Sequence, residues 1–191
     1  MENQNSFIGK KIENLILDAY FQEKFIKINL ADYSGQWLVL FFYPADFTFI
    51  CPTELAELAE LYEKFQKEKA EILSISTDTA FTHKAWHDHS PKIKLIQFPM
   101  VADPAAKLSK ALGVYLTEEG VALRGSFIVD PDGIIRAYEI HDNNIGRSGE
   151  ELLRKLQAAK FVREHTGEVC PASWKPGEKT LKPGVDLVGK I

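Results

Sequence analysis

The chain has two cysteines, Cys51 and Cys170, and the first of them lies where a thiol becomes reactive. Cys51 follows an apolar stretch and directly precedes a segment with helical periodicity, Pro52 to Lys69. A thiol at the start of a helix lies among unpaired backbone N–H groups and at the positive end of the helix dipole, which favour the thiolate. Because the thiolate is the nucleophilic form of cysteine, this position predicts a reactive sulfur with Cys170 as its one possible sulfur partner.

Composition and charge limit the class of protein in which such a sulfur could act. The 191 residues fit one domain or one domain with an appendage, and 45% hydrophobic with 26% charged residues is ordinary for a soluble protein. A net charge of −4 argues against nucleic acid or an anionic membrane as the main partner. The amino terminus lacks a signal-peptide pattern, and the longest apolar run, 37–43, is too short to span a bilayer. We therefore expect a cytoplasmic protein whose two cysteines are catalytic rather than a structural staple.

Strands are expected at several apolar runs along the chain. Two short strands at 15–17 and 25–28, with a turn region at 18–24, are followed by strands at 37–43, 72–76 and 99–102. The run 37–43 is apolar throughout, which is typical of a strand buried on both faces. Pro131-Asp132-Gly133 separates two further runs, 125–130 and 134–140, and predicts a hairpin.

Helices are expected between these strands. Amphipathic or capped helical segments occur at 52–69, 80–89 and 105–112, and Ser148 with Glu151 forms a capping box that opens a last helix to about residue 165. Strands that alternate with helices and then give way to a hairpin predict an α/β fold, a mixed sheet with helices on both faces. From Gly167 onward, glycines and prolines interrupt any period. We therefore expect a domain at 1–166 and an extended arm at 167–191 that carries Cys170.

Pro44-x-x-x-Thr48-x-x-Cys51 with Pro52-Thr53-Glu54 is similar to the active-site signature of the typical two-cysteine peroxiredoxins. The segments 123–130 and 146–148 are similar to their two arginine segments, and 167–171 with Trp174 and Pro176 is similar to their resolving-cysteine arm. The resemblance extends from about residue 7 to 191, and the ending 181–191 is similar to that of bacterial members. It implies a thioredoxin-like fold with an extended C-terminal arm and a thiol-dependent peroxidase that serves antioxidant defence.

The resemblance also implies a role for each residue of the site. Cys51 becomes the peroxidatic nucleophile, Cys170 the resolving cysteine, and Thr48, Pro44 and Arg124 the pocket around the peroxide, while Glu54 and Arg147 hold the polar network in place. The chemistry fits these residue types. Arg124 is a permanent cation that can bond both a thiolate and a peroxide oxygen, and Thr48 can donate and accept a hydrogen bond. Pro44 offers an apolar wall without an N–H donor.

Each of these residues also has a purely structural interpretation. Thr48 could cap the following helix, Arg124 could form a surface ion pair, and Arg147 could be a first-turn surface residue. Glu54 in the first turn of a helix is electrostatically favourable without any catalytic duty. His83, His87 and His89 suggest a metal site, but no further ligand is obvious at fitting spacing, so a solvated helix face is the better interpretation and no metal is expected.

The expected partners follow from the same comparison. A homodimer formed by exchange of C-terminal arms, assembling further into a decamer, is implied by the resemblance, whereas the sequence alone leaves open whether Cys51 and Cys170 meet within one chain or between two. The chain has no G-x-G-x-x-G motif, so no cofactor is expected and electrons must come from outside the chain. The resemblance implies that the donor is a flavoprotein disulfide reductase or a thioredoxin-like protein. Two other functions remain open. A thioredoxin-like disulfide exchanger would require a Cys-x-x-Cys pair that Cys51-Pro52-Thr53-Glu54 does not supply, and a holdase chaperone has no sequence mark and could coexist with a peroxidase.

Overall fold

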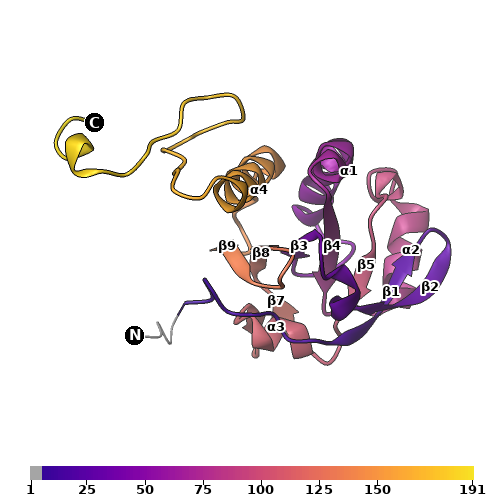
Figure 1. Ribbon diagram of the computed structural model, residues 1–191. Helices are drawn as coiled ribbons and strands as arrows, with labels where there is room; N and C mark the ends of the chain where they lie inside the picture. Colours follow the sequence, from indigo (N-terminus) through magenta and orange to yellow (C-terminus); the bar gives the residue numbers. More distant parts are fainter. Residues whose placement is uncertain (1–5) are drawn as a thin grey trace. The chain divides into compact units, whose positions relative to one another are not determined.

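The computed structural model describes residues 6–191, which form two compact units, one up to Gly149 and one at Glu150–Ile191 (Figure 1). The first unit is built on a seven-stranded mixed sheet in the order β2-β1-β5-β4-β3-β8-β9, beside a small sheet of β6 and β7. The strands are β1 Ile16–Phe21, β2 Lys24–Asn29, β3 Trp37–Phe42, β4 Ala70–Ser76, β5 Met100–Ala102, β6 Tyr115–Leu116, β7 Val121–Ala122, β8 Arg124–Val129 and β9 Ile135–His141. The predicted α/β fold is confirmed.

The central strand β3 is buried along its whole length, as its apolar sequence predicts. It pairs in parallel with β4, where Leu40 lies opposite Leu73, and antiparallel with β8, where Phe41 lies opposite Ser126. Because β3 and β8 run in opposite directions, the end of β3 and the start of β8 meet at the same edge of the sheet. The predicted hairpin is also present, since β8 and β9 pair antiparallel around the turn at 131–133.

Helices cover both faces of this sheet, as Figure 1 shows for α1 and α3. Leu108 and Leu112, in and just after α3, pack in the core cluster that contains Leu40 and Phe42. Phe41 points to the opposite face because side chains alternate along a strand, and α1 packs against β4 on this face. The helices of the first unit are α1 Cys51–Lys67, α2 Ala80–His89 and α3 Lys107–Ala111, with 3-10 turns η1 Leu30–Tyr33 and η2 Ile93–Leu95. The helix predicted at 105–112 is shorter because Ala106 has a left-handed φ of 52°.

One predicted element is wrong. The turn region expected at 18–24 is strand up to Phe21, and the turn consists of Gln22 and Glu23 alone, both with positive φ. The polar Asp18 that suggested a turn lies on the exposed side of β1, where it pairs across the strands with Lys27 at 2.6 Å. Charged residues on the solvent face of a half-buried strand are the ordinary pattern of an antiparallel pair.

The second unit consists of most of helix α4, Gly149–Glu164, and the segment that follows it. That segment is irregular apart from a bridge between Val169 and Leu181 and the 3-10 turn η3, Val185–Leu187, in agreement with the predicted arm. Trp174 contacts Phe161 of α4 with 4.9 Å between ring centroids, so the arm packs on the helix. The division of the chain after residue 166 stays a prediction. None of the helices within residues 6–191 has the length and apolar character needed to cross a membrane.

Candidate active site

Cys51 is the first residue of α1, and its side chain is fully buried. Ile50 is the N-cap residue, and its carbonyl accepts hydrogen bonds from the N–H groups of Thr53 at 2.9 Å and Glu54 at 3.3 Å. Pro52 takes the second helical position, where its missing N–H costs no hydrogen bond. The helix therefore begins one residue earlier than predicted, and the sulfur lies at its positive end.

Arg124 brings a positive charge to this sulfur. Its Nη1 lies 3.4 Å from Cys51 Sγ, and its Nε donates to the carbonyl of Asn143 at 3.0 Å. Arg124 is the first residue of β8, so the antiparallel pairing of β8 with β3 places it at the edge of the sheet where β3 ends. A buried guanidinium beside a buried sulfur stabilises negative charge on that sulfur.

Glu54 holds this arginine and a second one. One carboxylate oxygen accepts from Nη1 of Arg124 at 2.7 Å and from Nη2 of Arg147 at 3.1 Å. The other accepts from the backbone N–H and from Nε of Arg147, at 2.8 and 3.0 Å. Glu54 lies one turn after Cys51 in α1, so the same helix presents both the sulfur and the carboxylate that orients its cation. The three charged side chains are all buried.

Arg147 is fixed on every side. Its Nη1 donates to the carbonyl of Gly125 at 2.8 Å and to Oγ of Ser126 at 3.1 Å, and its guanidinium carbon lies 3.5 Å from the ring centroid of Phe41. Burial lowers the pKa of Arg147, and the hydrogen bonds and charge of Glu54 act in the opposite direction. For Glu54, burial raises the pKa, but the hydrogen bonds and charge of Arg147 and the charge of Arg124 outweigh burial and leave the pKa below its ordinary value. The carboxyl is therefore ionised at neutral pH.

The loop between β3 and α1 is anchored by Asp46. Its carboxylate accepts from the hydroxyl of Tyr43 at 2.7 Å and lies 2.8 Å from Nδ1 of His83, while its backbone N–H donates to Asp78 at 2.8 Å. Burial raises the pKa of Asp46, and the hydrogen bond and charge of His83 act against that rise. Phe47, the next residue, has a φ of 55°, a strained conformation for a side chain of this size. The buried anchor holds the strained backbone that leads to Cys51.

His83 corrects the interpretation of the histidines as a solvated helix face. Its side chain is completely buried, on the same face of α2 as Ala80 and Trp86, and it is paired with Asp46. The spacing of three residues from Ala80 and Trp86 is the sequence signal that would have found it. His89 is exposed, whereas His87 is half-buried beside the hydroxyl of Tyr20.

The three histidines do not meet at one site. Among residues 6–191, Glu23, His87 and Asp88 are the one group whose ligand atoms lie close enough to hold a metal, within 4.8 Å of one another. Glu23 already accepts from the hydroxyl of Tyr20 at 3.1 Å, and Asp88 is paired with Lys84 at 2.5 Å. This group includes neither His83 nor His89.

Thr48 and Pro44 lie in the same loop as the Asp46 anchor. Pro44 is buried, two residues after the end of β3. The half-buried Thr48 donates its hydroxyl hydrogen to the carbonyl of Ala45 at 2.9 Å, and α1 begins with no side-chain cap. The alternative of Thr48 as an N-cap is therefore wrong, because the capping position belongs to Ile50. The Thr48 oxygen keeps lone pairs with which to accept a further hydrogen bond.

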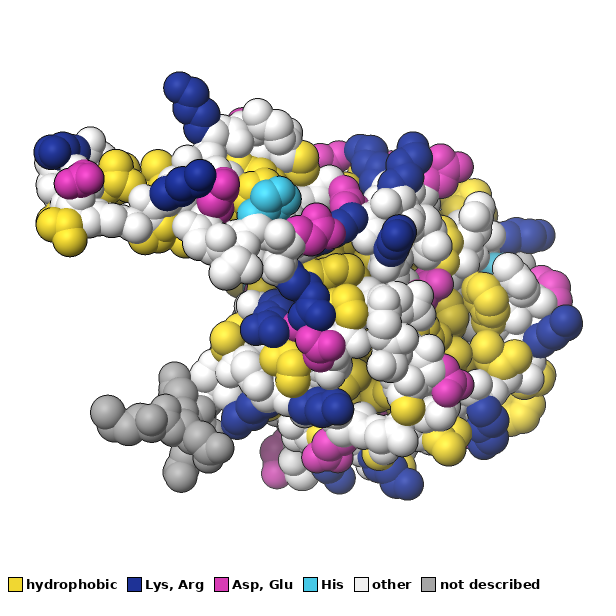
Figure 2. All heavy atoms as spheres, in the orientation of Figure 1, with side chains coloured by type: hydrophobic (Ala, Val, Ile, Leu, Met, Phe, Trp, Pro, Cys, Tyr) yellow, Lys and Arg dark blue, Asp and Glu magenta, His cyan; other side chains and the backbone are white. Residues whose placement is uncertain are grey.

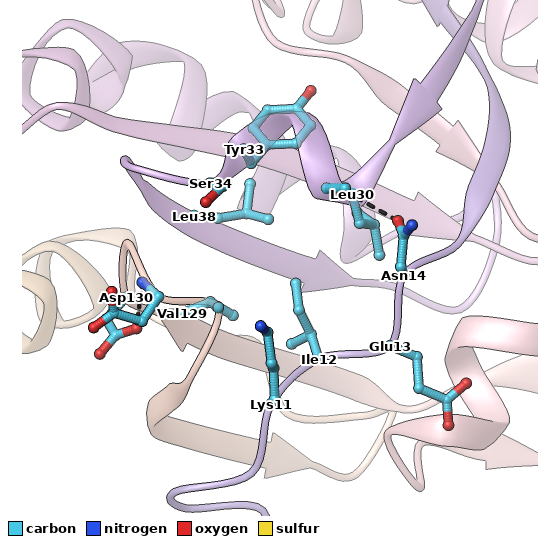
Figure 3. A pocket seen from close by; sticks show the side chains of 13 residues that line it. Lys11, Ile12, Glu13, Asn14, Leu30, Tyr33, Ser34, Leu38, Val129 and Asp130 are labelled. Carbon is cyan, nitrogen blue, oxygen red and sulfur yellow. Dashed lines mark hydrogen bonds between the residues drawn. The ribbon is translucent and has the colours of Figure 1, made fainter.

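A pocket of about 340 Å³ lies away from this site, between the segment 11–14, η1 and the turn at 131–133. Figure 3 shows Ile12, Leu30 and Leu38 around its apolar part and Lys11 beside it. Leu38 is near the start of β3, whereas the loop that carries Pro44 follows the end of that strand. The pocket therefore belongs to the opposite end of β3 from Cys51.

Comparison with known proteins agrees with this fold. The model of the AhpC/TSA family matches residues 8–138, and that of the C-terminal domain of 1-Cys peroxiredoxin matches 158–190, a segment in which this chain carries Cys170. Alkyl hydroperoxide reductase C of Salmonella typhimurium is 50% identical, and that of Pseudomonas aeruginosa 48%, each over 97% of this chain and 100% of the relative. The crystal structure of reduced 2-Cys peroxiredoxin of Plasmodium vivax has a TM-score of 0.90 at 31% identity, over 95% of each chain.

A second solved structure, AhpC of Enterococcus faecalis, has a TM-score of 0.85 at 45% identity and covers 87% of this chain and 99% of that one. Fold, buried thiol and relatives together define a thiol-dependent peroxidase with a thioredoxin-like fold, an oxidoreductase of the peroxiredoxin class. The chain belongs to the AhpC/TSA family.

Replacement of Glu54 by Gln should lower the free energy of unfolding by about 3 kcal/mol at pH 7, because it leaves two buried guanidinium groups without their anion. A carboxyl whose pKa is lowered by folding contributes stability above its unfolded pKa of about 4.3 and loses it as the pH falls through the lower folded value. The difference between wild type and Glu54→Gln should therefore be constant above about pH 5 and shrink below about pH 4.

Urea unfolding across this pH range measures the effect. Glu60→Gln, an exposed position of the same helix, is the matched control and should stay within about 0.5 kcal/mol of wild type. Equal stability of the Glu54 and Glu60 variants at pH 7 would show that the carboxylate does not hold the two arginines.

Replacement of His83 by Leu should release the Asp46 anchor. We expect a loss of about 1–3 kcal/mol in unfolding free energy, because the buried Asp46 carboxylate loses a partner, and an oxidation of Cys51 by hydroperoxide that is slower by about tenfold or more, because the loop before it loosens. His89→Leu, at an exposed position of the same helix, should change neither quantity measurably. If the two variants behave alike in denaturant unfolding and stopped-flow oxidation, the anchor has no role in the site.

Proposed function

We propose that Cys51 reduces hydroperoxides and is oxidised to a sulfenic acid. The observation that carries this proposal is the 3.4 Å contact between the guanidinium of Arg124 and the buried sulfur at the first position of α1. Helix terminus and guanidinium both stabilise negative charge on sulfur, which is the requirement for a nucleophilic thiol. The same guanidinium can donate to the peroxide oxygen as the O–O bond breaks.

The reaction at Cys51 balances without a cofactor. The thiolate attacks one oxygen of the hydroperoxide, an S–O bond forms as the O–O bond breaks, and the departing alkoxide or hydroxide takes up a proton to leave as alcohol or water. Thr48, whose hydrogen is directed to Ala45, accepts the hydrogen bond of the hydroperoxide O–H. Pro44 closes the site with an apolar surface, and Glu54 and Arg147 keep Arg124 aimed at the sulfur.

Cys170 completes the cycle in this proposal. Its thiolate attacks the sulfur of the Cys51 sulfenic acid, the S–O bond breaks, and after protonation the oxygen leaves as water while a Cys51–Cys170 disulfide forms. An external disulfide reductase, either a flavoprotein or a thioredoxin-like protein, then supplies two electrons. The irregular arm that carries Cys170 supports access by such a donor, because a segment with few backbone hydrogen bonds can rearrange at low cost and expose the disulfide.

The names of the relatives favour organic hydroperoxides as substrates beside hydrogen peroxide. Two relatives that are 48% and 50% identical to this chain are named alkyl hydroperoxide reductase C. A sulfur that attacks the terminal oxygen of R–O–O–H needs no specific contact with the group R, so both substrate classes suit the same chemistry. Antioxidant defence in the cytoplasm is the corresponding cellular role.

Assembly as an arm-exchanged homodimer, and then as a decamer, is part of the proposal. An exposed aromatic surface supports association of copies: Phe25 is 51% exposed and Phe81 73% exposed, and their ring centroids lie 4.8 Å apart. Figure 2 shows hydrophobic side chains at the surface over β1, β2 and α2, and Phe47 of the loop before Cys51 is also exposed. Exposed aromatic clusters of this kind are typical of interaction surfaces. Sedimentation velocity of the reduced and oxidised protein gives the assembly state directly.

Loss of peroxide in the presence of limiting enzyme distinguishes the two cysteines. Cys51→Ser should be inactive, whereas Cys170→Ser should reduce about one equivalent of hydroperoxide and stop unless a small thiol is added, because its sulfenic acid has no resolving partner. Mass spectrometry of the oxidised wild type should show the Cys51–Cys170 disulfide. Undiminished peroxide consumption by Cys51→Ser would remove the central claim.

A further inference from the structure

Cys170 lies in a charged setting of its own within the second unit. The sulfur is half-buried, and the thiol is directed at the carbonyl of Ala158 in α4, 3.9 Å away. Burial raises the pKa of this thiol, the positive charge of Arg154 lowers it in part, and the negative charge of Glu168 raises it. Arg154 is therefore the one charge in this setting that favours the reactive form of the sulfur.

Arg154 is held in place by three hydrogen bonds. Its Nε and Nη2 donate to the two carboxylate oxygens of Glu151, one turn earlier in α4, at 2.7 and 2.8 Å. Its Nη1 donates to the backbone carbonyl of Trp174 in the arm at 3.1 Å. A guanidinium with a bidentate carboxylate on one side and a carbonyl on the other has little freedom, so its position relative to the arm is fixed.

The arm segment that receives this bond is itself compact. The N–H of Trp174 donates to the carbonyl of Pro171 at 3.2 Å, and its indole N–H donates to the carbonyl of Glu178 at 3.1 Å. The Trp174 ring packs on Phe161 of α4. Because Cys170 directly precedes this folded segment, the bond from Arg154 to Trp174 also sets where the sulfur lies against the helix.

We propose that Arg154 is a positioning residue for Cys170, one whose fixed guanidinium keeps a positive charge beside the resolving sulfur. In the step concerned, the Cys170 thiol first loses its proton to water, and the thiolate then attacks the sulfenic sulfur so that an S–S bond replaces the S–O bond and the oxygen leaves as water. Arg154 acts on the first of these events. The inference rests on the proposed resolving role of Cys170.

Glu151 does not cancel the effect of Arg154. The Glu151 carboxylate is also paired with Nζ of Lys155 at 3.8 Å, so α4 presents two cations and one anion at this point. On the arm, the charge of Glu168 is shared with Lys182 at 3.8 Å, and its carboxylate accepts from the hydroxyl of Thr180. The negative charge of Glu151 is therefore shared by two cations, and Arg154 remains the helix residue whose charge acts on the sulfur, while the opposing charge from the arm is partly neutralised.

The test follows Cys170 by itself, in the Cys51→Ser background, where no disulfide can form within the protein. The rate of alkylation by iodoacetamide is measured between pH 6 and 10 by mass spectrometry for this protein and for versions with Arg154→Met, Arg154→Lys or Arg136→Met. Met removes the charge at similar length, Lys keeps the charge without the bidentate fork, and Arg136 is a control arginine in β9 that pairs with Asp130.

Arg154→Met should shift the alkylation midpoint to higher pH and slow alkylation at pH 7 by roughly three- to tenfold. Arg154→Lys should have an alkylation midpoint close to that of the Cys51→Ser parent, and Arg136→Met should leave the midpoint unchanged. An arm that merely came loose would give the opposite sign, because loss of burial lowers the midpoint toward that of a free thiol. A midpoint that stays in place or falls in Arg154→Met would overturn the proposal.

A second measurement uses the enzyme with both cysteines. After one equivalent of hydroperoxide, Arg154→Met should form the sulfenic acid at the wild-type rate but the disulfide more slowly, with the deficit largest at low pH and recovered as the pH rises. Equal rates of disulfide formation at all pH values would contradict the role of Arg154. Absence of any Cys51–Cys170 disulfide in the unaltered enzyme is a different outcome, which would remove the proposed function of Cys170 itself.

Discussion

The structure depends on one buried carboxylate between two buried guanidinium groups. Glu54 bonds Arg124 and Arg147 at once, and ions removed from water in this way are stable only when their partners are close and fully hydrogen-bonded. The three side chains carry a formal charge of +1 between them, and Cys51 lies 3.4 Å from one of the cations. A thiolate at Cys51 would bring this cluster to neutrality. In the proposed reaction, the buried ion network therefore supplies the positive charge that faces the thiolate.

The fold supplies the positions that this balance needs. Antiparallel pairing of β8 with β3 brings Arg124 to the sheet edge where the loop of Pro44 and Cys51 begins, and α1 places Glu54 one turn from the sulfur. Arg147 enters from the segment after β9 and stacks on Phe41 of β3. Three stretches of the chain, 41–54, the start of β8 and the segment after β9, therefore converge, and a second buried pair, Asp46 with His83, fixes the strained loop between β3 and α1.

Much of this fold could be predicted from sequence because the hydrophobic patterns are unambiguous. The run at 37–43, the helix after Cys51 and the hairpin around 131–133 each have a strong local signal. The strand around Asp18 was missed because a polar residue on the solvent face of a strand resembles a turn residue when its cross-strand partner, Lys27, is not known. The sequence also held the seven proposed site residues, but the shared carboxylate of Glu54 and the Asp46–His83 pair depend on contacts between distant segments. Only the spacing of His83 with Ala80 and Trp86 hinted at its burial.

The two cysteines occupy different electrostatic settings. Cys51 is fully buried at a helix terminus beside a guanidinium, whereas Cys170 is half-buried on an irregular arm, where burial raises the pKa of its thiol and Arg154 acts against that rise. In the proposed cycle the first sulfur must react with a dilute oxidant, and the second needs to attack only a sulfenic acid that is presented to it. A buried thiol beside a fixed guanidinium and a half-buried thiol on an irregular arm suit these two tasks.

The most direct measurement is the rate at which Cys51 is oxidised in a single turnover when Arg124 is replaced by Gln in the Cys170→Ser background. If the guanidinium stabilises both the thiolate and the departing oxygen, stopped-flow oxidation by hydroperoxide should slow by about 100-fold or more at pH 7. Because Glu54 keeps its pairing with Arg147, the variant should remain folded, and circular dichroism checks this. An oxidation rate equal to that of the Cys170→Ser parent would contradict the account, because Arg124 would then have no part in activating the sulfur.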